Sequence, residues 1–212
     1  MKRPTVVAIG GFESDVGKTT LMCDLLGVLS GWEAIKTTRG HYRSCGKDPL
    51  ACCVSHLLSD QPTIRSGREE TNTPGKDTGR YWEAGASNVH WLIATEKQME
   101  SGIKSALKRV KAPGVLIEGN SFTKFVEVDF AILVTRSKGG KMKSSARRLL
   151  AIASGLFVSD LANTGDPTSK DSTSWCEESI ASRLIRDLPI YTQNDLPKLT
   201  HRLRQIQAQV AS

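Results

Sequence analysis

The stretch TVVAIGGFESDVGKTTLMCDLLGVLSG, residues 5–31, decides the fold class. Its first part, Thr5 to Gly10, is a short, nearly all-apolar run, which is typical of a strand buried on both faces of a parallel sheet. From Lys18 onward, apolar residues recur at helical spacing until Gly31, where a helix would end. The chain therefore opens as a strand, a glycine-containing loop and a helix.

The loop between this strand and this helix has the features of a phosphate-binding loop, because glycines flank it and it ends in GKTT, residues 17–20. In such loops the backbone N–H groups and the helix dipole favour an anion. Lys18 would then reach the β- and γ-phosphates, and the Thr19 hydroxyl would ligate Mg²⁺. The sequence predicts a site for GTP or ATP with Mg²⁺. The expected nucleotide contacts come from Gly11, Val16, Gly17, Lys18, Thr19 and Thr20.

The spacing of the loop departs from the usual pattern. Five residues separate Gly11 from Gly17 where four are usual, and Phe12 follows the first glycine. This longer form, ending in DVGKTT, resembles the loop of dethiobiotin synthetase and of its wider class of P-loop proteins, which includes metal-insertion GTPases. The resemblance implies that phosphate binding is retained. Asp15 is a candidate catalytic residue that orients a metal-bound water or a substrate amine, or else accepts a loop N–H.

Strands and helices alternate along the rest of the chain. Strands are expected at 33–38, 89–94, 114–118, 128–135, 156–159 and 188–192, and helices at 77–86, 96–110, 144–154 and 197–210. This order predicts an α/β fold with a mainly parallel, doubly wound sheet, the P-loop NTPase fold, whose ligands bind at the carboxyl ends of the strands. We expect residues 1–212 to form a single nucleotide-binding domain.

Glu118 ends the apolar strand expected at 114–118, so its carboxylate should lie at the same sheet edge as the phosphate loop. In P-loop folds an acid at this place holds Mg²⁺, directly or through water, or orients the attacking nucleophile. Glu118 is therefore a candidate Mg²⁺ ligand beside Thr19, and a candidate catalytic group beside Lys18 and Asp15. A strand-end or helix-capping carboxylate is the alternative interpretation.

The motif PGKDTGR at residues 74–80, followed by AGA at 84–86, is similar to the signature of the molybdopterin-guanine dinucleotide biosynthesis protein B (MobB) family. The resemblance covers roughly residues 5–135. It implies a small, often dimeric GTP-binding protein that hydrolyses nucleotide slowly and assists a client cofactor-biosynthesis enzyme. We accordingly expect a homodimer. Asp77 and Arg80 share a helical face, so they could pair with each other or contact a phosphate and its metal.

Soft metal ligands gather in the long polar connection at about 39–75, where the order is H-x3-C-x6-C-C-x2-H. A helix over Leu50–Ser59 would place Cys52 and His56 on one face, and Cys45 precedes them. Thiolate and imidazole suit zinc or nickel, but this spacing matches none of the standard zinc-finger patterns. We expect little or no tightly bound zinc in the purified protein.

The composition excludes several classes of protein. Of the 212 residues, 39% are hydrophobic and 24% charged, and no segment is long and apolar enough for a membrane span. No secretion signal is evident and the five cysteines are an odd number, so we expect a cytoplasmic protein. The net charge of +7 is spread along the chain, which favours an anionic small ligand over nucleic acid.

Three functions are open at this point. The first is an accessory NTPase similar to MobB in molybdenum cofactor maturation. The second is a P-loop small-molecule kinase or an ATP-dependent ligase, in which the polar connection folds over a substrate. The third is a metallochaperone in which nucleotide binding gates a site formed by cysteine and histidine.

Overall fold

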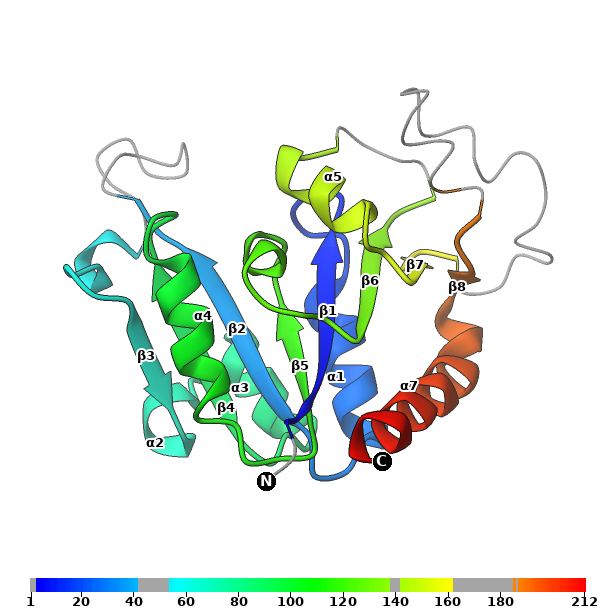
Figure 1. Cartoon of the computed structure of the whole chain (residues 1–212), viewed down its shortest axis with the longest axis horizontal. Helices are drawn as coiled ribbons and strands as arrows, with labels where there is room; N and C mark the ends of the chain where they lie inside the picture. The colour runs from blue at the N-terminus through cyan, green and yellow to red at the C-terminus, as the bar shows by residue number, and fades with distance from the viewer. Residues whose placement is uncertain (1–2, 42–53, 138–141, 162–184, 186) are drawn as a thin grey trace.

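The computed structural model describes residues 3–41, 54–137, 142–161, 185 and 187–212 (Figure 1). The strands are β1 (Thr5–Gly11), β2 (Glu33–Arg39), β3 (Thr63–Ser66), β4 (Val89–Ala94), β5 (Gly114–Glu118), β6 (Phe130–Thr135), β7 (Gly155–Val158) and β8 (Ile190–Tyr191). The helices are α1 (Lys18–Val28), α2 (Arg68–Thr71), α3 (Asp77–Glu83), α4 (Met99–Leu107), α5 (Ser144–Leu150) and α7 (Leu196–Ala211).

One sheet organises the described part of the chain, in the order β3-β4-β2-β5-β1-β6-β7-β8. All neighbouring strands are parallel except β3, which is antiparallel to β4 at the edge. Strand β1 lies between β5 and β6 and is buried along its whole length, as its apolar sequence predicts. The predicted mainly parallel sheet is therefore confirmed.

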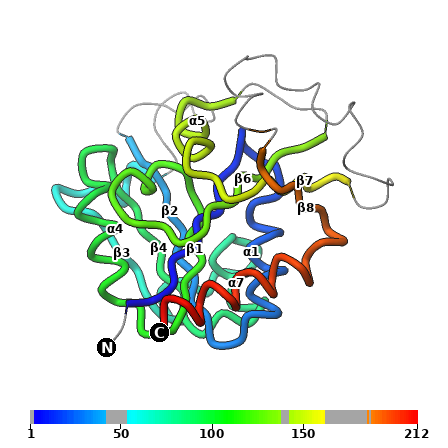
Figure 2. The backbone as a smooth tube through the Cα atoms, turned by 45° about the vertical axis from the view of Figure 1, so that its right-hand side comes forward, coloured from blue at the N-terminus to red at the C-terminus, as the bar shows by residue number. Residues whose placement is uncertain are grey.

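Helices cover both faces of the sheet and form two apolar cores. On one face α1, α3 and α7 pack on alternate residues of the central strands, among them Val7 and Ile9. On the other face α4 and α5 pack on the intervening residues, among them Val6 and Ala8. Figure 2 shows α7 running beside α1, which it contacts. The sheet is doubly wound, and its carboxyl edge is left accessible.

A buried polar contact between two side chains joins the strands β2 and β4. The Nε2 atom of His90 lies 2.8 Å from a carboxylate oxygen of Glu33, and both side chains are buried. The other Glu33 oxygen accepts the backbone N–H groups of Lys111 and Ala112 at 2.9 and 3.0 Å. His90 Nδ1 lies 2.9 Å from the hydroxyl oxygen of Ser66 on β3. These contacts connect β2, β3 and β4 with one another and with the segment before β5.

The structure corrects the interpretation of the long connection at 39–75. A strand and a short helix, β3 and α2, lie within it, and neither was expected. The helix expected over Leu50–Ser59 is also wrong in its described part, where only a 3-10 turn, Ser55–Leu57, forms. Elsewhere the expected elements are present, most of the helices being a few residues shorter than predicted. No helix among the described residues is long and apolar enough to cross a membrane.

Candidate phosphate-binding site

The extra residue of the phosphate loop is absorbed where β1 ends. The N–H of Phe12 donates to the carbonyl of Val134 at 3.0 Å, which extends the pairing of β1 with β6, and the Phe12 ring is only 2% exposed. The loop then turns through Asp15, a non-glycine residue with a positive φ of 57°. The Phe12 side chain is therefore part of the apolar core. The residues after it make the turn into α1, which begins at Lys18.

The first turn of α1 has neither a side-chain cap at Gly17 nor an acidic residue. The first N–H groups of any helix lack partners within the helix, so they need a side chain, water or a ligand. Together with the helix dipole they form an anion site. Thr19 and Thr20 line the cavity at this end of the helix. Of the predicted contact residues, Gly17, Lys18, Thr19 and Thr20 line this cavity, whereas Gly11 and the buried Val16 are not among its lining residues.

Asn120 anchors the loop and was not predicted as a site residue. Its side chain accepts the N–H of Gly11 and donates to the carbonyl of Gly11, both at 2.9 Å. A Cβ atom on Gly10 would lie 2.3 Å from Asn120 Oδ1 and 2.0 Å from Leu149, so only glycine permits this approach. In the sequence, Asn120 follows Glu118 and Gly119 but belongs to none of the motifs described above.

Lys18 lies inside the loop, as predicted. Its Nζ atom is 3.4 Å from the carbonyl oxygen of Glu13, a long contact that a phosphate could replace. Burial lowers the pKa of Lys18, and the neighbouring Glu118 carboxylate opposes that shift. A half-buried ammonium group whose one hydrogen bond to the described residues is long is a favourable place for an anion.

Glu118 accepts hydrogen bonds from three side chains at the carboxyl edge of β5. The Thr19 hydroxyl donates at 3.0 Å, the Lys36 ammonium at 2.5 Å, and the Tyr81 hydroxyl also donates to it. Burial and the Glu118 charge raise the pKa of Tyr81 well above its usual range, so Tyr81 stays a donor. Thr19 and Glu118, predicted as partners, are indeed neighbours.

Lys36, in the middle of β2 and paired in register with Glu118 at the end of β5, bridges two carboxylates and was missed as a site residue. Its Nζ atom lies 2.5 Å from Glu118 and 2.6 Å from Asp77. Burial lowers the pKa of Lys36, but the two carboxylates raise it by more, so that the net shift is upward. The close partner of Asp77 is thus Lys36, although Arg80 lines the same cavity and helps to lower the pKa of Asp77.

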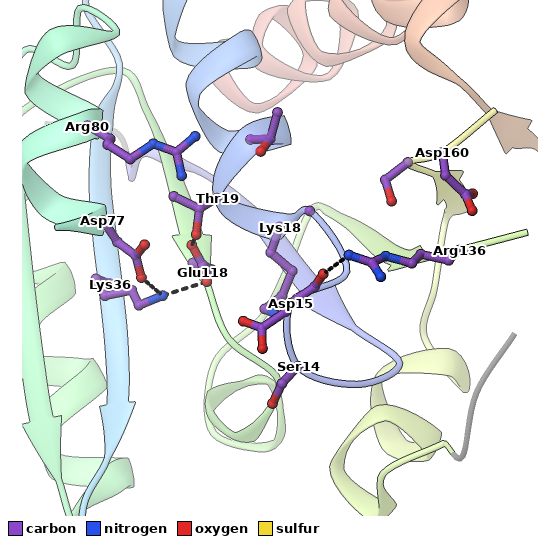
Figure 3. A pocket seen from close by; sticks show the side chains of 13 residues that line it. Ser14, Asp15, Lys18, Thr19, Lys36, Asp77, Arg80, Glu118, Arg136 and Asp160 are labelled. Carbon is purple, nitrogen blue, oxygen red and sulfur yellow. Dashed lines mark hydrogen bonds and ion pairs between the residues drawn. The ribbon is translucent and has the colours of Figure 1, made fainter. Parts of the chain in front are cut away.

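These groups surround a cavity of about 680 Å³ (Figure 3). Lys36 and Asp77 lie at one end of it, and Lys18 lies near the middle. Arg136 and Asp160 lie at the other end, and Arg136 donates to the carbonyl of Asp15 at 2.6 Å. The charged side chains number four basic and four acidic: Lys18, Lys36, Arg80, Arg136, Asp15, Asp77, Glu118 and Asp160. Their formal charges cancel.

The oxygen donors at the Lys36 end suit Mg²⁺. Carboxylate and hydroxyl oxygens are hard ligands of the kind that Mg²⁺ prefers, and Thr19, Asp77 and Glu118 supply them within one cavity. Lys36 holds both carboxylates, so a divalent cation has to compete with its ammonium group. Thr19 and Glu118 would hold the ion, as the sequence predicts, and Asp77 joins them as a further candidate.

The cysteine and histidine segment receives little support as a metal centre. Cys45 and Cys52 lie outside the described residues, and His56 is exposed in the turn Ser55–Leu57. Within the described ranges, no group of three or more histidine, cysteine, aspartate or glutamate side chains could hold a metal ion. The proposed ligand set of Cys45, Cys52 and His56 stays a prediction.

No protein-family model and no curated protein matches this sequence. Among solved structures, the chain is similar to HypB from Helicobacter pylori in complex with nickel, with a TM-score of 0.50 and 12% identity over 97% of this chain and 88% of that one. It also resembles the Zn(II)-bound YjiA GTPase from E. coli, with a TM-score of 0.42 and 14% identity over 91% and 58% of the two chains. The likeness to HypB shows the fold: this chain has the P-loop NTPase fold.

Proposed function

We propose that this protein binds a nucleoside triphosphate with Mg²⁺ and hydrolyses it slowly. One observation carries the proposal: Lys18, Thr19 and Glu118 meet at the uncapped N-terminus of α1. Because the formal charges of the described residues that line the cavity cancel, this lining offers no net positive charge to a triphosphate. Mg²⁺ has to neutralise part of the ligand, so nucleotide binding should depend strongly on the metal.

Calorimetry of GTP and ATP binding, each with and without Mg²⁺, tests this proposal. We expect binding of at least one nucleotide with Mg²⁺, and a loss of at least about tenfold in affinity in Lys18→Ala, since a charge-assisted contact to phosphate is removed. Lys108→Ala, an exposed lysine on α4's side of the sheet, is the matched control. Unchanged affinity in Lys18→Ala would show that the loop does not hold the phosphates.

Hydrolysis is tested with Glu118→Gln. This change keeps the size of the side chain but removes the charge that faces Thr19 and Lys36. We expect turnover of bound nucleotide to fall by about tenfold or more, with a smaller change in nucleotide affinity, because the proposed action of Glu118 is on the metal or the nucleophile. Single-turnover phosphate release measures the effect. Wild-type turnover in the variant would make Glu118 a structural residue.

For the biological role we favour nucleotide-gated metal delivery. The support is the likeness over nearly the whole chain to HypB, a protein solved in complex with nickel. In this role, metal is cargo that Cys45, Cys52 and His56 would hold, and the Mg–nucleotide site would control its affinity. Measurements of metal content and of nickel affinity, with and without nucleotide, test this role.

A MobB-like accessory role is the second candidate. Its support is the motif at residues 74–80, because Asp77 and Arg80 both line the proposed nucleotide cavity. This role would require GTP in preference to ATP, a homodimer and a client cofactor-biosynthesis enzyme. Co-purification of such an enzyme with the protein, lost on removal of GTP, would favour it over metal delivery.

A further inference from the structure

A second cavity, of about 360 Å³, adjoins the proposed nucleotide site. The two cavities share Lys36 and Asp77 among their lining residues, so they meet at these side chains. The second cavity is otherwise lined from the sheet by Thr38 and Trp91, and from the 74–80 motif by residues that include Lys76. A molecule placed there would lie beside the Lys36 end of the first cavity.

The motif at residues 74–80 builds one wall of this cavity. Gly75, Lys76, Asp77 and Thr78 line it directly. A Cβ atom on Gly79 would lie 2.1 Å from the carbonyl oxygen of Thr73, so glycine is needed for the connection to fold against α3. Of this motif, Asp77 and Arg80 line the proposed nucleotide site, and the second cavity adds Gly75, Lys76 and Thr78.

The charges in the second cavity favour an anion. Lys76 contributes a positive charge, whereas Lys36 is paired with Asp77 at 2.6 Å and with Glu118 at 2.5 Å and adds no net positive charge. Lys76 is exposed at the start of α3, and its side chain makes no hydrogen bond or ion pair with the residues that the structure describes. Its ammonium group is therefore available to a ligand.

Trp91 gives the cavity a flat apolar wall. Its Nε1 donates to the hydroxyl oxygen of Thr38 at 2.9 Å, so the polar end of the indole is already satisfied. The Arg65 guanidinium lies over the ring, 5.7 Å from its centroid, so the part of the ring that lines the cavity is what remains for a ligand. A cavity with one aromatic wall and ammonium groups selects molecules that carry both a ring and a negative charge.

We propose that this cavity is a second binding site, for a small anionic molecule with a planar ring, held by Lys76 and Trp91 beside the nucleotide. Its use as the site of a second substrate rests on the proposed nucleotide function, whereas binding of the ring-bearing anion does not. Because Lys36 belongs to both cavities, ligands in the two cavities compete for one ammonium group and their affinities are linked. This arrangement is the one that the kinase or ligase alternative requires.

Phenyl phosphate is a suitable probe, with inorganic phosphate as the matched anion without a ring. Calorimetric and saturation-transfer NMR titrations are made with the wild-type protein and with Lys18→Ala. The variant removes the phosphate loop as a competing anion site and leaves the second cavity intact. We expect phenyl phosphate to bind Lys18→Ala at least about tenfold more tightly than inorganic phosphate, because only phenyl phosphate contacts the indole ring.

Two substitutions, made in the Lys18→Ala background, then test the cavity itself. Lys76→Gln should weaken phenyl phosphate binding by about tenfold, and Trp91→Leu by a similar factor, while Trp91→Phe retains most of the affinity. Lys108→Gln is the control for loss of a surface charge. Lys76 is exposed, so its replacement leaves the fold intact, and thermal unfolding checks the Trp91 variants.

The outcomes separate this proposal from the nucleotide proposal. Nucleotide affinity, measured in Lys76→Gln with an intact phosphate loop, should stay within about twofold of wild type, since Lys76 does not line the first cavity. The second site is refuted if phenyl phosphate binding disappears in Lys18→Ala, or if Lys76→Gln and Lys108→Gln reduce it equally. Loss of nucleotide binding in Lys18→Ala with retained phenyl phosphate binding supports both proposals.

Discussion

At the scale of single residues, Lys36 occupies the space between Glu118 and Asp77 that a divalent cation would otherwise take. Two carboxylates this close repel each other unless a positive charge lies between them. Lys36 supplies that charge with contacts of 2.5 and 2.6 Å. The ligand-free site is thereby stabilised without metal, and it should bind divalent cations weakly until a nucleotide draws Lys36 away.

Replacing Lys36 with methionine tests this idea. Lys36→Met leaves the buried Glu118 carboxylate and Asp77 without their shared cation, so metal should take its place. We expect Mn²⁺ to bind the nucleotide-free variant on the order of tenfold more tightly than wild type. Electron paramagnetic resonance of free Mn²⁺ gives the affinity, and Lys104→Met, on the exposed face of α4, is the control. Equal Mn²⁺ affinity in the wild type and Lys36→Met would contradict the competition.

Individual site residues were predictable from the sequence only where they belong to one local motif. Lys18 and Thr19 follow from the loop itself, and Glu118 follows from its place at the end of an apolar strand. Lys36 and Asn120 were missed, because their partners are about 40 to 110 residues away in the sequence. The sequence does show Lys36 as a charged residue within an expected strand. Its pairing with Glu118 could not be predicted without knowing the order of the strands in the sheet.

At the scale of elements, the buried Glu33 carboxylate links β2 to β4 and to the segment before β5. Burial raises the pKa of Glu33, but the hydrogen bonds from His90, Lys111 and Ala112 lower it by more, so that the net shift is downward. A carboxyl group with a lowered pKa in the folded state stabilises the protein above its ordinary pKa. That contribution is lost as the pH falls through the folded-state pKa.

Glu33→Gln should therefore destabilise the protein in a pH-dependent way. We expect a loss of about 1–3 kcal/mol in the free energy of unfolding at neutral pH, since a charged acceptor of buried N–H groups is removed. The difference from wild type should shrink below the ordinary range for glutamate, because wild-type Glu33 then also becomes neutral. Urea unfolding at several pH values measures it. A difference that is constant with pH would rule out an ionised Glu33.

The elements that the sequence did not reveal lie at the β3 edge. Strand β3, with the sequence TIRS, is only partly buried along its length and has an arginine on it. Edge strands often carry such charges, and they weaken the apolar alternation on which strand prediction depends. The central strands were predictable because burial on both faces makes them continuously apolar.

At the scale of the whole molecule, metal content distinguishes the proposed roles. The spacing of Cys45, Cys52 and His56 provides no closed set of four ligands, so the reduced, nucleotide-free protein should contain well under one zinc or nickel per chain. If nucleotide gates metal delivery, Mg–GTP or Mg–ATP should change the nickel affinity by at least about fivefold. Cys45→Ser with Cys52→Ser should abolish that change.

Elemental analysis measures the metal content per chain, and competition with a chromophoric chelator measures the nickel affinity. Cys23→Ser is the control, because Cys23 is on α1 and does not belong to the segment. A nickel affinity that does not change when nucleotide is added would contradict gated metal delivery. It would favour the MobB-like accessory role. Stoichiometric metal in the nucleotide-free protein would show instead that the segment folds into a closed site.

The uncapped start of α1 has a consequence for the lifetime of the protein. A helix whose first N–H groups await an anion is completed by its ligand, so occupancy adds to the free energy of unfolding as RT ln(1 + [L]/Kd). At a hundred times Kd this is about 2.7 kcal/mol. Resistance to proteolysis would then rise and fall with the nucleotide concentration, and nucleotide-free molecules would be degraded first.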